Sequence, residues 1–297
     1  MTSSATHRAA VLALLVSGAL WGTTWMPLKH FAAAGLTGLT LTLCTYGLLG
    51  VLALPWLLKA RPRWWGSRRL LLLMGVLSGL SNACWVTGLM FGQVTRVMLL
   101  FYLIPVWAML GARLFLGEPV TRLRLLAVVM AVGGAVLVLG GPGALAGPPQ
   151  PLDLLAVLAG LLFAASNLCA RAASEVPVPV KAVVVFAGCA LVGGALIPVV
   201  DHALPPIEPP LALELAAFAL VWITAAMFTQ AYGITHLEAG RAGVLLVFEL
   251  VAAVATAMVF AGERLDSAGW FGAALIVTAA LLETLHTSHV PEQGSPP

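Results

Sequence analysis

One carboxylate, Glu249, lies in the middle of an apolar segment, GVLLVFELVAAVATA, that covers residues 243–257. A charged carboxylate in hydrocarbon is costly, so it must face a cavity, pair with another group or carry a proton. Two roles follow for Glu249. It binds a proton or a substrate ammonium group, or it is a neutral acid that hydrogen bonds hold in a structural role. The sequence leaves both roles open.

Polar and aromatic residues also recur at helical spacing. Trp21 and Thr24 lie on one face of a predicted helix with Ser17, and Trp25 lies beside them. Comparable positions in five further apolar segments are Asn82 and Trp85, Phe101 and Tyr102, Asn167, Gln230 and Glu249. An aromatic wall with few fixed charges suits a neutral or zwitterionic metabolite. Each residue has an alternative role, because polar side chains also join neighbouring membrane helices and Trp often marks the interface.

Other chemistries have little support in the sequence. The motifs G-x-S-x-G and H-E-x-x-H are absent, the His residues are scattered, and the four Cys residues form no C-x-x-C pair. We therefore expect no catalytic residue, no cofactor, no metal site and no direct ATP coupling. An intramembrane enzyme and a membrane scaffold or sensor that does not transport remain the alternative classes.

The elements that must position these residues are membrane helices. Hydrophobic residues make up 61% of the 297 residues and charged residues only 9%, whereas a soluble domain has about 25% charged residues. The mean hydropathy is +1.01. Lipid offers backbone groups no partners, so long apolar runs must be helical. We predict ten such helices: 9–29, 38–58, 70–91, 94–116, 123–140, 152–171, 180–200, 212–234, 239–261 and 267–285.

An internal repeat relates the two halves of the chain. A shift of 145 residues aligns 88–118 with 233–263 without a gap, and nine of the 31 positions are identical. Arg96 matches Arg241, and both segments end in a Gly-Glu pair. Because these residues are rare in such an apolar chain, we take the repeat as genuine.

The repeat defines the predicted domains. The first repeat covers 9–140, the second covers 152–285, and 286–297 form a polar tail that we expect to be disordered. Each repeat holds five helices, so the second copy enters the membrane in the opposite orientation. Many secondary transporters have this architecture and bind substrate between the halves. The predicted fold is an all-α integral membrane bundle of ten transmembrane helices in two inverted-topology five-helix repeats.

The basic residues predict the orientation. A cytoplasmic N-terminus places 12 of the 15 Lys and Arg residues inside and leaves only Lys29, Arg96 and Arg264 outside. By the positive-inside rule, both termini are cytoplasmic and the protein lies in the cell membrane, the inner or plasma membrane. The basic segment KARPRWWGSRR is read as a cytoplasmic loop at the lipid surface, so we expect no nucleic acid partner.

Three segments resemble the EamA family of the drug/metabolite transporter superfamily. They are LWGTTWMPLKHF, FYLIPVWAMLGARLFLGEPV and VFAGERLDSAGWFGAALIV, and the resemblance extends over about residues 9–285. FYLIPVW is also similar to the aromatic amino-acid exporter branch of that superfamily. The second repeat has Leu250 where the first has Pro105, so a kink at Pro105 need not be mirrored.

The resemblance implies a central cavity lined by the first, third, fourth, sixth, eighth and ninth helices, and export or exchange of small metabolites. We therefore expect a secondary transporter of amino acids or similar amphipathic, neutral or zwitterionic compounds, with export favoured and with alternating access between the repeats. The Gly- and Ala-rich helices at the periphery favour close packing within the bundle or in a homodimer.

Two polar features need separate interpretations. Glu118 and Glu263 follow helix-ending glycines, and we interpret them as caps near the start of the next helix. Lys29 either binds a substrate carboxylate or extends to the membrane surface, and the second role is favoured.

Overall fold

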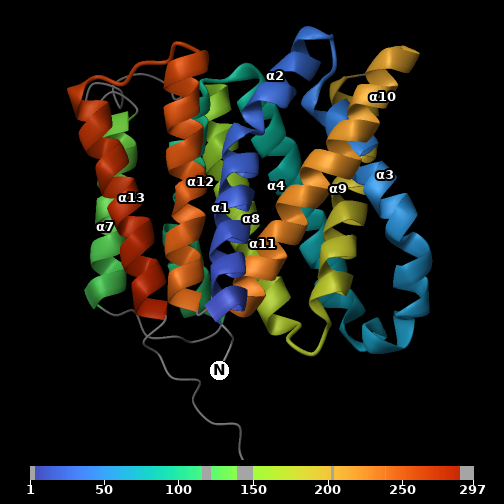
Figure 1. Cartoon of the computed structure of the whole chain (residues 1–297), viewed down its shortest axis with the longest axis horizontal. Helices are drawn as coiled ribbons and strands as arrows, with labels where there is room; N and C mark the ends of the chain where they lie inside the picture. The colour runs from blue at the N-terminus through green and yellow to red at the C-terminus, as the bar shows by residue number, and fades with distance from the viewer. Residues whose placement is uncertain (1–3, 116–121, 139–149, 202–203, 238, 288–297) are drawn as a thin grey trace, which may run out of the picture.

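The computed structural model describes residues 4–115, 122–138, 150–201, 204–237 and 239–287, and the regular secondary structure in these ranges is helical. The helices pack side by side with their axes roughly along one direction (Figure 1). Their bounds in the first half are α1 (Ser4–Thr23), α2 (Trp25–Ala33), α3 (Gly38–Lys59), α4 (Arg68–Phe91), α5 (Val94–Phe101), α6 (Ile104–Phe115) and α7 (Arg122–Val138). In the second half they are α8 (Pro151–Ala172), α9 (Val178–Val200), α10 (Pro209–Ala217), the π-helix η4 (Phe218–Ile223), α11 (Thr224–His236), α12 (Ala239–Phe260) and α13 (Ser267–Thr287).

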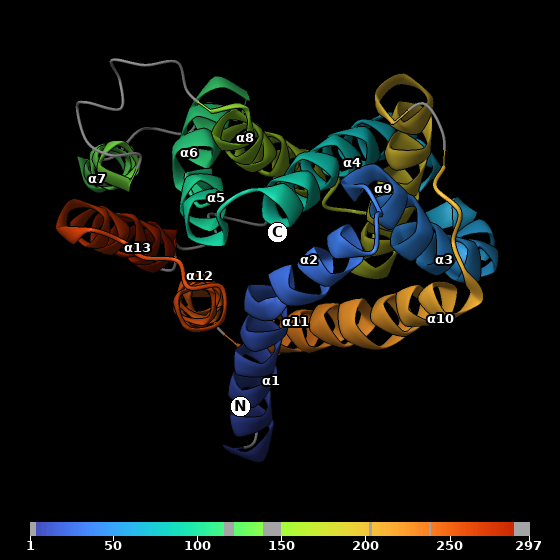
Figure 2. The ribbon, with the colours of Figure 1, turned by 90° about the horizontal axis from the view of Figure 1, so that it is seen from above.

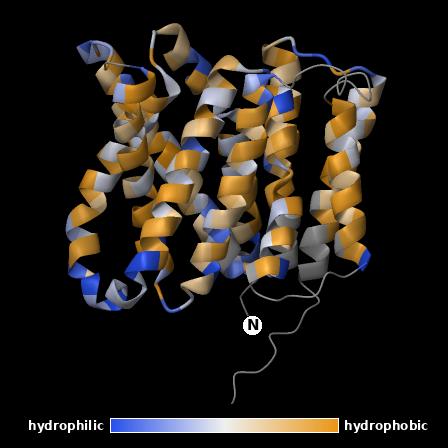
Figure 3. Ribbon diagram, turned by 180° about the vertical axis from the view of Figure 1, so that it is seen from behind, coloured by the Kyte–Doolittle hydropathy of each residue, from blue (hydrophilic) through white to orange (hydrophobic). Residues whose placement is uncertain are grey.

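Several of these helices have the length and composition of membrane spans. Six helical stretches, in 6–33, 38–59, 65–91, 151–172, 178–200 and 209–233, are long and apolar enough to cross a bilayer. Shorter apolar helices cover 125–138, 245–260 and 267–279. Figure 3 shows that hydrophobic residues make up most of each helix. Large apolar side chains are exposed at many positions of the helices. Such a surface is stable only against lipid, so the fold is that of a multi-pass membrane protein.

Each predicted span coincides with one helix or with consecutive helices separated by a short break. α1 and α2 meet at Thr24, and α5 and α6 meet at 102–103. Pro27 and Pro105 explain these breaks, because each lacks the N–H that would bond to the carbonyl four residues earlier. The second repeat has Leu250 at the equivalent position, and α12 runs without interruption from Ala239 to Phe260, so the break at Pro105 has no counterpart there.

The two halves interlock through matching contacts. α1 contacts α11 and α12, while α8 contacts α4, α5 and α6, and the 145-residue shift relates these two sets. α3 packs on its own counterpart, α9. Gly50 near the end of α3 lies against Ala187, whereas Gly193 further along α9 lies against Leu39 near the start of α3. The two helices are therefore antiparallel.

The central helices come from both halves. Seen from above, α1, α4, α5 and α12 surround the centre of the bundle, with α7 and α13 at one end and α3, α9 and α10 at the other (Figure 2). Glycines allow the closest approaches: a Cβ on Gly22 of α1 would lie 2.6 Å from the Glu249 carbonyl oxygen of α12. This arrangement brings polar and aromatic residues from distant segments together at the centre.

Candidate substrate-binding site

A connected set of aromatic rings links three of the central helices with α8. Trp21 of α1 meets Trp85 of α4 edge to face, with 6.3 Å between ring centroids, and Trp85 meets Phe101 of α5 at 6.2 Å. Phe101 also contacts Tyr102 at 6.0 Å and Phe163 of α8 at 5.7 Å. We call these five residues the aromatic cluster. It unites side chains that the sequence places up to 142 positions apart, from Trp21 to Phe163.

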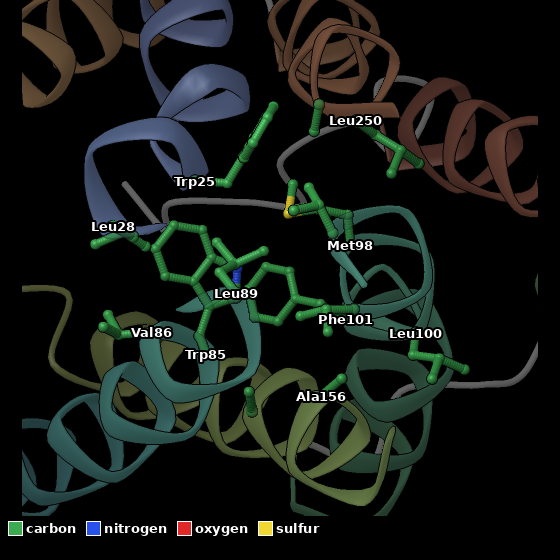
Figure 4. Close-up of a cluster of buried hydrophobic side chains, with 14 of the residues drawn as sticks. Trp25, Leu28, Trp85, Val86, Leu89, Met98, Leu100, Phe101, Ala156 and Leu250 are labelled. Atoms are coloured by element: carbon green, nitrogen blue, oxygen red, sulfur yellow. The ribbon is translucent and has the colours of Figure 1, made fainter. Parts of the chain in front are cut away.

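Apolar side chains extend this cluster across the centre. Trp25, Trp85, Met98, Phe101 and Leu250 belong to one buried cluster, which Figure 4 shows in close-up. They come from α2, α4, α5 and α12, and Trp25 and Trp85 are buried. The centre of the bundle is therefore an aromatic and apolar environment to which both repeats contribute.

Two of the central indoles are fixed by hydrogen bonds. The Trp25 indole N–H donates to the Thr256 hydroxyl at 3.0 Å, which joins α2 to α12. The Trp222 indole N–H in η4 is shared between the Thr24 hydroxyl at 3.0 Å and the Leu20 carbonyl oxygen at 3.1 Å. Thr24 thus accepts a hydrogen bond from η4 at the junction of α1 and α2.

The Trp21 and Trp85 indoles differ from these. Both Nε1 atoms are buried, and neither has a hydrogen-bond partner among the described residues. A buried donor without a partner costs about 1–3 kcal/mol, so such groups are uncommon in folded proteins. Both groups belong to the aromatic cluster.

The predicted site residue Asn82 has protein partners on both sides of its amide. Its oxygen accepts from the Thr42 hydroxyl at 3.0 Å, and its nitrogen donates to the Tyr46 hydroxyl at 3.1 Å. A cavity of about 10 Å³ adjoins these side chains, between α2, α3, α4 and η4. Its lining residues are Thr24, Leu28, Leu41, Thr42, Thr45, Tyr46, Trp85, Val86, Phe218 and Ile223. Because metabolite sites usually have about 300 Å³ or more, the helices must move apart before a substrate fits here.

Glu249 lies at the edge of the aromatic cluster. Its side chain is partly buried and interacts with that of Tyr102. The Tyr102 hydroxyl also donates weakly to the Leu246 carbonyl oxygen, at 3.4 Å. On the other side, Gly18 and Gly22 of α1 pack against the Glu249 backbone. The carboxylate therefore lies where α12 approaches both α1 and α5.

Two predicted site residues have no contact with this cluster in the part of the chain that the structure describes. Asn167 is exposed on α8, one turn beyond Phe163, which itself lies at the edge of the cluster. Gln230 is partly buried on α11. The π-helix η4 precedes Gln230. Because a π-turn holds more residues than an α-turn, the residues after η4 face other directions than a continuous α-helix would give them.

A polar network at the start of α5 was not predicted as a unit. Glu263 accepts from the backbone N–H groups of Val94 at 2.7 Å and Thr95 at 2.8 Å. The N-cap residue of α5, Gln93, makes no side-chain cap bond of its own. Gly262, with φ of 68°, ends α12 in the left-handed conformation and directs the chain toward α5. Glu263 is therefore a helix cap as predicted, but it caps a helix of the other repeat and not the helix that follows it.

Two further contacts hold the same end of α5. Arg96 forms a two-point ion pair with Asp153 of α8, with nitrogen–oxygen distances of 2.5 and 3.2 Å. The Lys29 ammonium donates to the Gly92 carbonyl oxygen at 3.0 Å, which ties α2 to the turn before α5. The sequence carried one signal for this network, because Arg96 and the Gly-Glu pairs recur in register in both repeats.

Comparison with known proteins gives the family. The EamA-like transporter family matches this sequence over residues 8–140 and again over residues 150–285. The chain belongs to this family. Its two matched segments correspond to the two halves of the fold, and its family is one of transporters and not of enzymes.

Two relatives of this EamA-like protein are informative. A curated protein described as "Riboflavin transporter", from Rhizobium johnstonii (strain DSM 114642 / LMG 32736 / 3841), is 30% identical over 224 residues. The match covers 69% of this chain and 67% of the relative. A solved crystal structure with 18% sequence identity matches 96% of this chain and 99% of its own, with a TM-score of 0.59. That likeness supports the same fold.

Proposed function

We propose that the protein is a secondary transporter that carries a small metabolite through the centre of the bundle. The observation that carries the proposal is the aromatic cluster, which both repeats build at the centre and which Glu249 adjoins. Aromatic faces bind planar or apolar bodies, and a nearby carboxylate accepts a proton or a donor group of the substrate. The bilayer is its environment, and the distribution of basic residues favours cytoplasmic termini and the inner or plasma membrane.

Two substrate classes fit this environment. Neutral or zwitterionic amino acids, aromatic ones above all, match the combination of aromatic rings and a carboxylate. Riboflavin is the second, because a relative with 30% identity is described as a riboflavin transporter and a flavin ring is planar and aromatic. Export is the direction we favour for amino acids.

We further propose that transport occurs by alternating access between inverted repeats. The antiparallel packing of α3 on its counterpart α9 supports inversion, since a helix and its copy then cross the membrane in opposite directions. The α4–α5 and α11–α12 hairpins are the moving parts. The contacts of Glu263, Asp153 and Lys29 with the start of α5 close the face that the predicted topology assigns to the outside.

A liposome assay tests the substrate proposal. Purified protein is reconstituted, and uptake of riboflavin, L-phenylalanine and L-tryptophan is measured with and without a pH gradient. Transport of at least one compound above protein-free liposomes supports the proposal, and dependence on the gradient indicates proton coupling. If none of these compounds moves in either direction, the proposed substrate classes are wrong.

A crosslink tests the proposed movement. Arg96→Cys and Asp153→Cys are combined in a chain whose four native cysteines are replaced, and a short cleavable bis-maleimide joins α5 to α8. The replaced residues are Cys44, Cys84, Cys169 and Cys189. We expect the crosslink to abolish flux and its cleavage to restore the flux of the untreated double variant, while the reagent leaves the flux of each single-cysteine variant as it was before treatment. Unchanged flux through the crosslinked protein would show that α5 and α8 need not separate.

A further inference from the structure

Trp21 and Trp85 are two tryptophans in contact with each other whose indole N–H groups both lack a partner among the described residues. The N–H groups of Trp25 and Trp222 reach oxygen acceptors at 3.0 Å, and the Trp64 N–H donates to the Leu57 carbonyl oxygen at 3.0 Å. Three indole N–H groups, those of Trp21, Trp85 and Trp107, are instead buried without a partner among the described residues. Trp21 and Trp85 carry buried donors without partners, and these donors belong to two rings that contact each other.

Their position also excludes simple exposure to water as an explanation. The Trp85 side chain is only 7% exposed, and both Nε1 atoms are inaccessible. Apolar and aromatic side chains surround Trp85: Phe101 contacts its ring, and Leu89 and Met98 lie in the same buried core. The Thr and Tyr hydroxyls that line the adjoining cavity make no hydrogen bond with the Trp85 indole, so its donor is available to an acceptor of a molecule that enters the site.

We infer that the indole N–H groups of Trp21 and Trp85 donate hydrogen bonds to acceptor atoms of the transported substrate. This inference rests on the proposed function and defines the substrate more closely. The substrate carries carbonyl oxygens, carboxylate oxygens or ring nitrogens on or beside a flat apolar body. Both tryptophans recognise these acceptors, while the rings of the aromatic cluster contact the flat body.

Glu249 and Tyr102 adjoin the same aromatic cluster. Phe101 contacts both Trp85 and Tyr102, and Tyr102 interacts with Glu249. Two free donors and a carboxylate acceptor thus adjoin one aromatic cluster. A molecule that carries both an acceptor and a donor satisfies them together, as the carboxylate and ammonium of an amino acid or the carbonyl and imide N–H groups of a flavin do.

The first test removes the donors and keeps an aromatic ring. Trp21→Phe and Trp85→Phe are reconstituted, and riboflavin and L-phenylalanine are used as probes. A lost hydrogen bond to a neutral acceptor lowers affinity roughly tenfold at most, and one to a carboxylate lowers it further. We expect each variant to raise KM several-fold to about tenfold, with a smaller change in kcat, because the bond forms in the bound state.

The control variant is Trp107→Phe, which reduces the ring by the same amount and also removes an unpartnered donor. The Trp107 indole N–H is also buried without a partner, but its ring has no aromatic contact with Trp21 or Trp85 in the described chain. We expect this variant to keep the wild-type KM. An equal rise of KM in all three variants would assign the effect to lost ring volume and overturn the inference.

A second test observes the donors directly. Ultraviolet resonance Raman spectra distinguish free from hydrogen-bonded indole N–H groups, and the difference between wild type and the double variant isolates Trp21 and Trp85. We expect free indoles without a probe and hydrogen-bonded ones with the transported probe. Indoles that are already hydrogen-bonded without a probe would show that water or protein fills the site, and the inference would be wrong. Failure of the wild-type protein to move any probe would instead overturn the proposed function.

Discussion

The crossing of α4 with α8 and the crossing of α1 with α11 occupy equivalent places in the two repeats, since the 145-residue shift relates them. Both contain a serine whose hydroxyl bonds to the opposite backbone. Ser81 donates to the Ala159 carbonyl oxygen at 2.8 Å, and Ser17 donates to that of Ala226 at 3.1 Å. Ser81 lies in α4, the counterpart of α11, whereas Ser17 lies in α1, the counterpart of α8. The serine therefore comes from a different member of the helix pair in each repeat.

The two crossings differ in what fills them. At the α4–α8 crossing, the Ser78 and Ser166 hydroxyls are 2.6 Å apart, and α9 packs on α4 through Gly75 and Gly188. The shift places Trp21 in α1 where α8 has Ser166. Small, hydrogen-bonded side chains thus fill one crossing, whereas the other carries a large ring with a free donor. A duplicated fold can use one copy of a contact for stability and the other for binding.

The largest expected effect is at the crossing of α9 with α4, which adjoins the α4–α8 crossing. Gly188→Val places a side chain against the Gly75 carbonyl oxygen, where even a Cβ would overlap it. Overpacking against backbone should lower the free energy of unfolding by about 3 kcal/mol. Thermal unfolding of the purified protein in detergent measures the change. Gly133→Ala is the control, because a Cβ there has no atom within 4 Å, and equal stability of the two variants would mean that the crossing is not tight.

The second effect concerns the carboxylate of Glu249, which lies beside the α1–α11 crossing. Glu249 has Ile104 as its counterpart in the first repeat, so the fold itself does not require an acid there. Glu249→Gln keeps the shape and removes the titration, and it should lower flux by about tenfold or more and flatten its pH dependence. Flux in liposomes over a range of pH tests this, with the exposed Glu214→Gln as control. A wild-type profile in Glu249→Gln would assign it a structural role.

The third effect compares two indoles at the α1–α11 crossing, one that is hydrogen-bonded within the protein and one that is not. Trp222→Phe removes donation to Thr24 and Leu20, and it should cost about 1 kcal/mol of stability. Trp21→Phe breaks no protein hydrogen bond and should cost less. Unfolding of both variants in parallel measures the difference. Greater destabilisation by Trp21→Phe would mean that Trp21 is chiefly a packing residue.

The smallest effect is expected at the paired serines. Ser78→Ala removes one hydrogen bond, but Ser166 retains a second acceptor in the Met74 carbonyl oxygen at 3.3 Å. We expect a loss of about 0.5 kcal/mol and an unchanged KM. A raised KM in liposomes would show that the α4–α8 crossing also contributes to binding, and the contrast between the crossings would fail.

Much of the fold could be predicted from the sequence because backbone groups in lipid must hydrogen bond to one another, which long apolar segments achieve as helices. Apolar runs therefore gave the positions of the helices, and Pro105 gave one of the breaks. The break at Thr24 was missed although Pro27 lies close by, and η4 has no local sequence signal. Because η4 changes the direction in which the residues of α11 face, it accounts for the position of Gln230.

The site was harder to predict because periodicity gives a face of a helix but not the helix that it meets. Trp25 was placed beside a polar stripe, yet its partner, Thr256, lies in the other repeat. Asn167 was placed on the correct helix, but its side chain is exposed. Long-range contacts of this kind depend on how the two halves pack, which no single segment encodes.

The cap on α5 has a consequence for measuring transport. Val94 and Thr95 bond to Glu263 of the other repeat, so separation of the halves would leave these two amides without their acceptors. Their hydrogen exchange would then accelerate whenever this face opens. The exchange rates of two backbone protons would thus report the fraction of time the transporter spends open on that side, without any label or substrate.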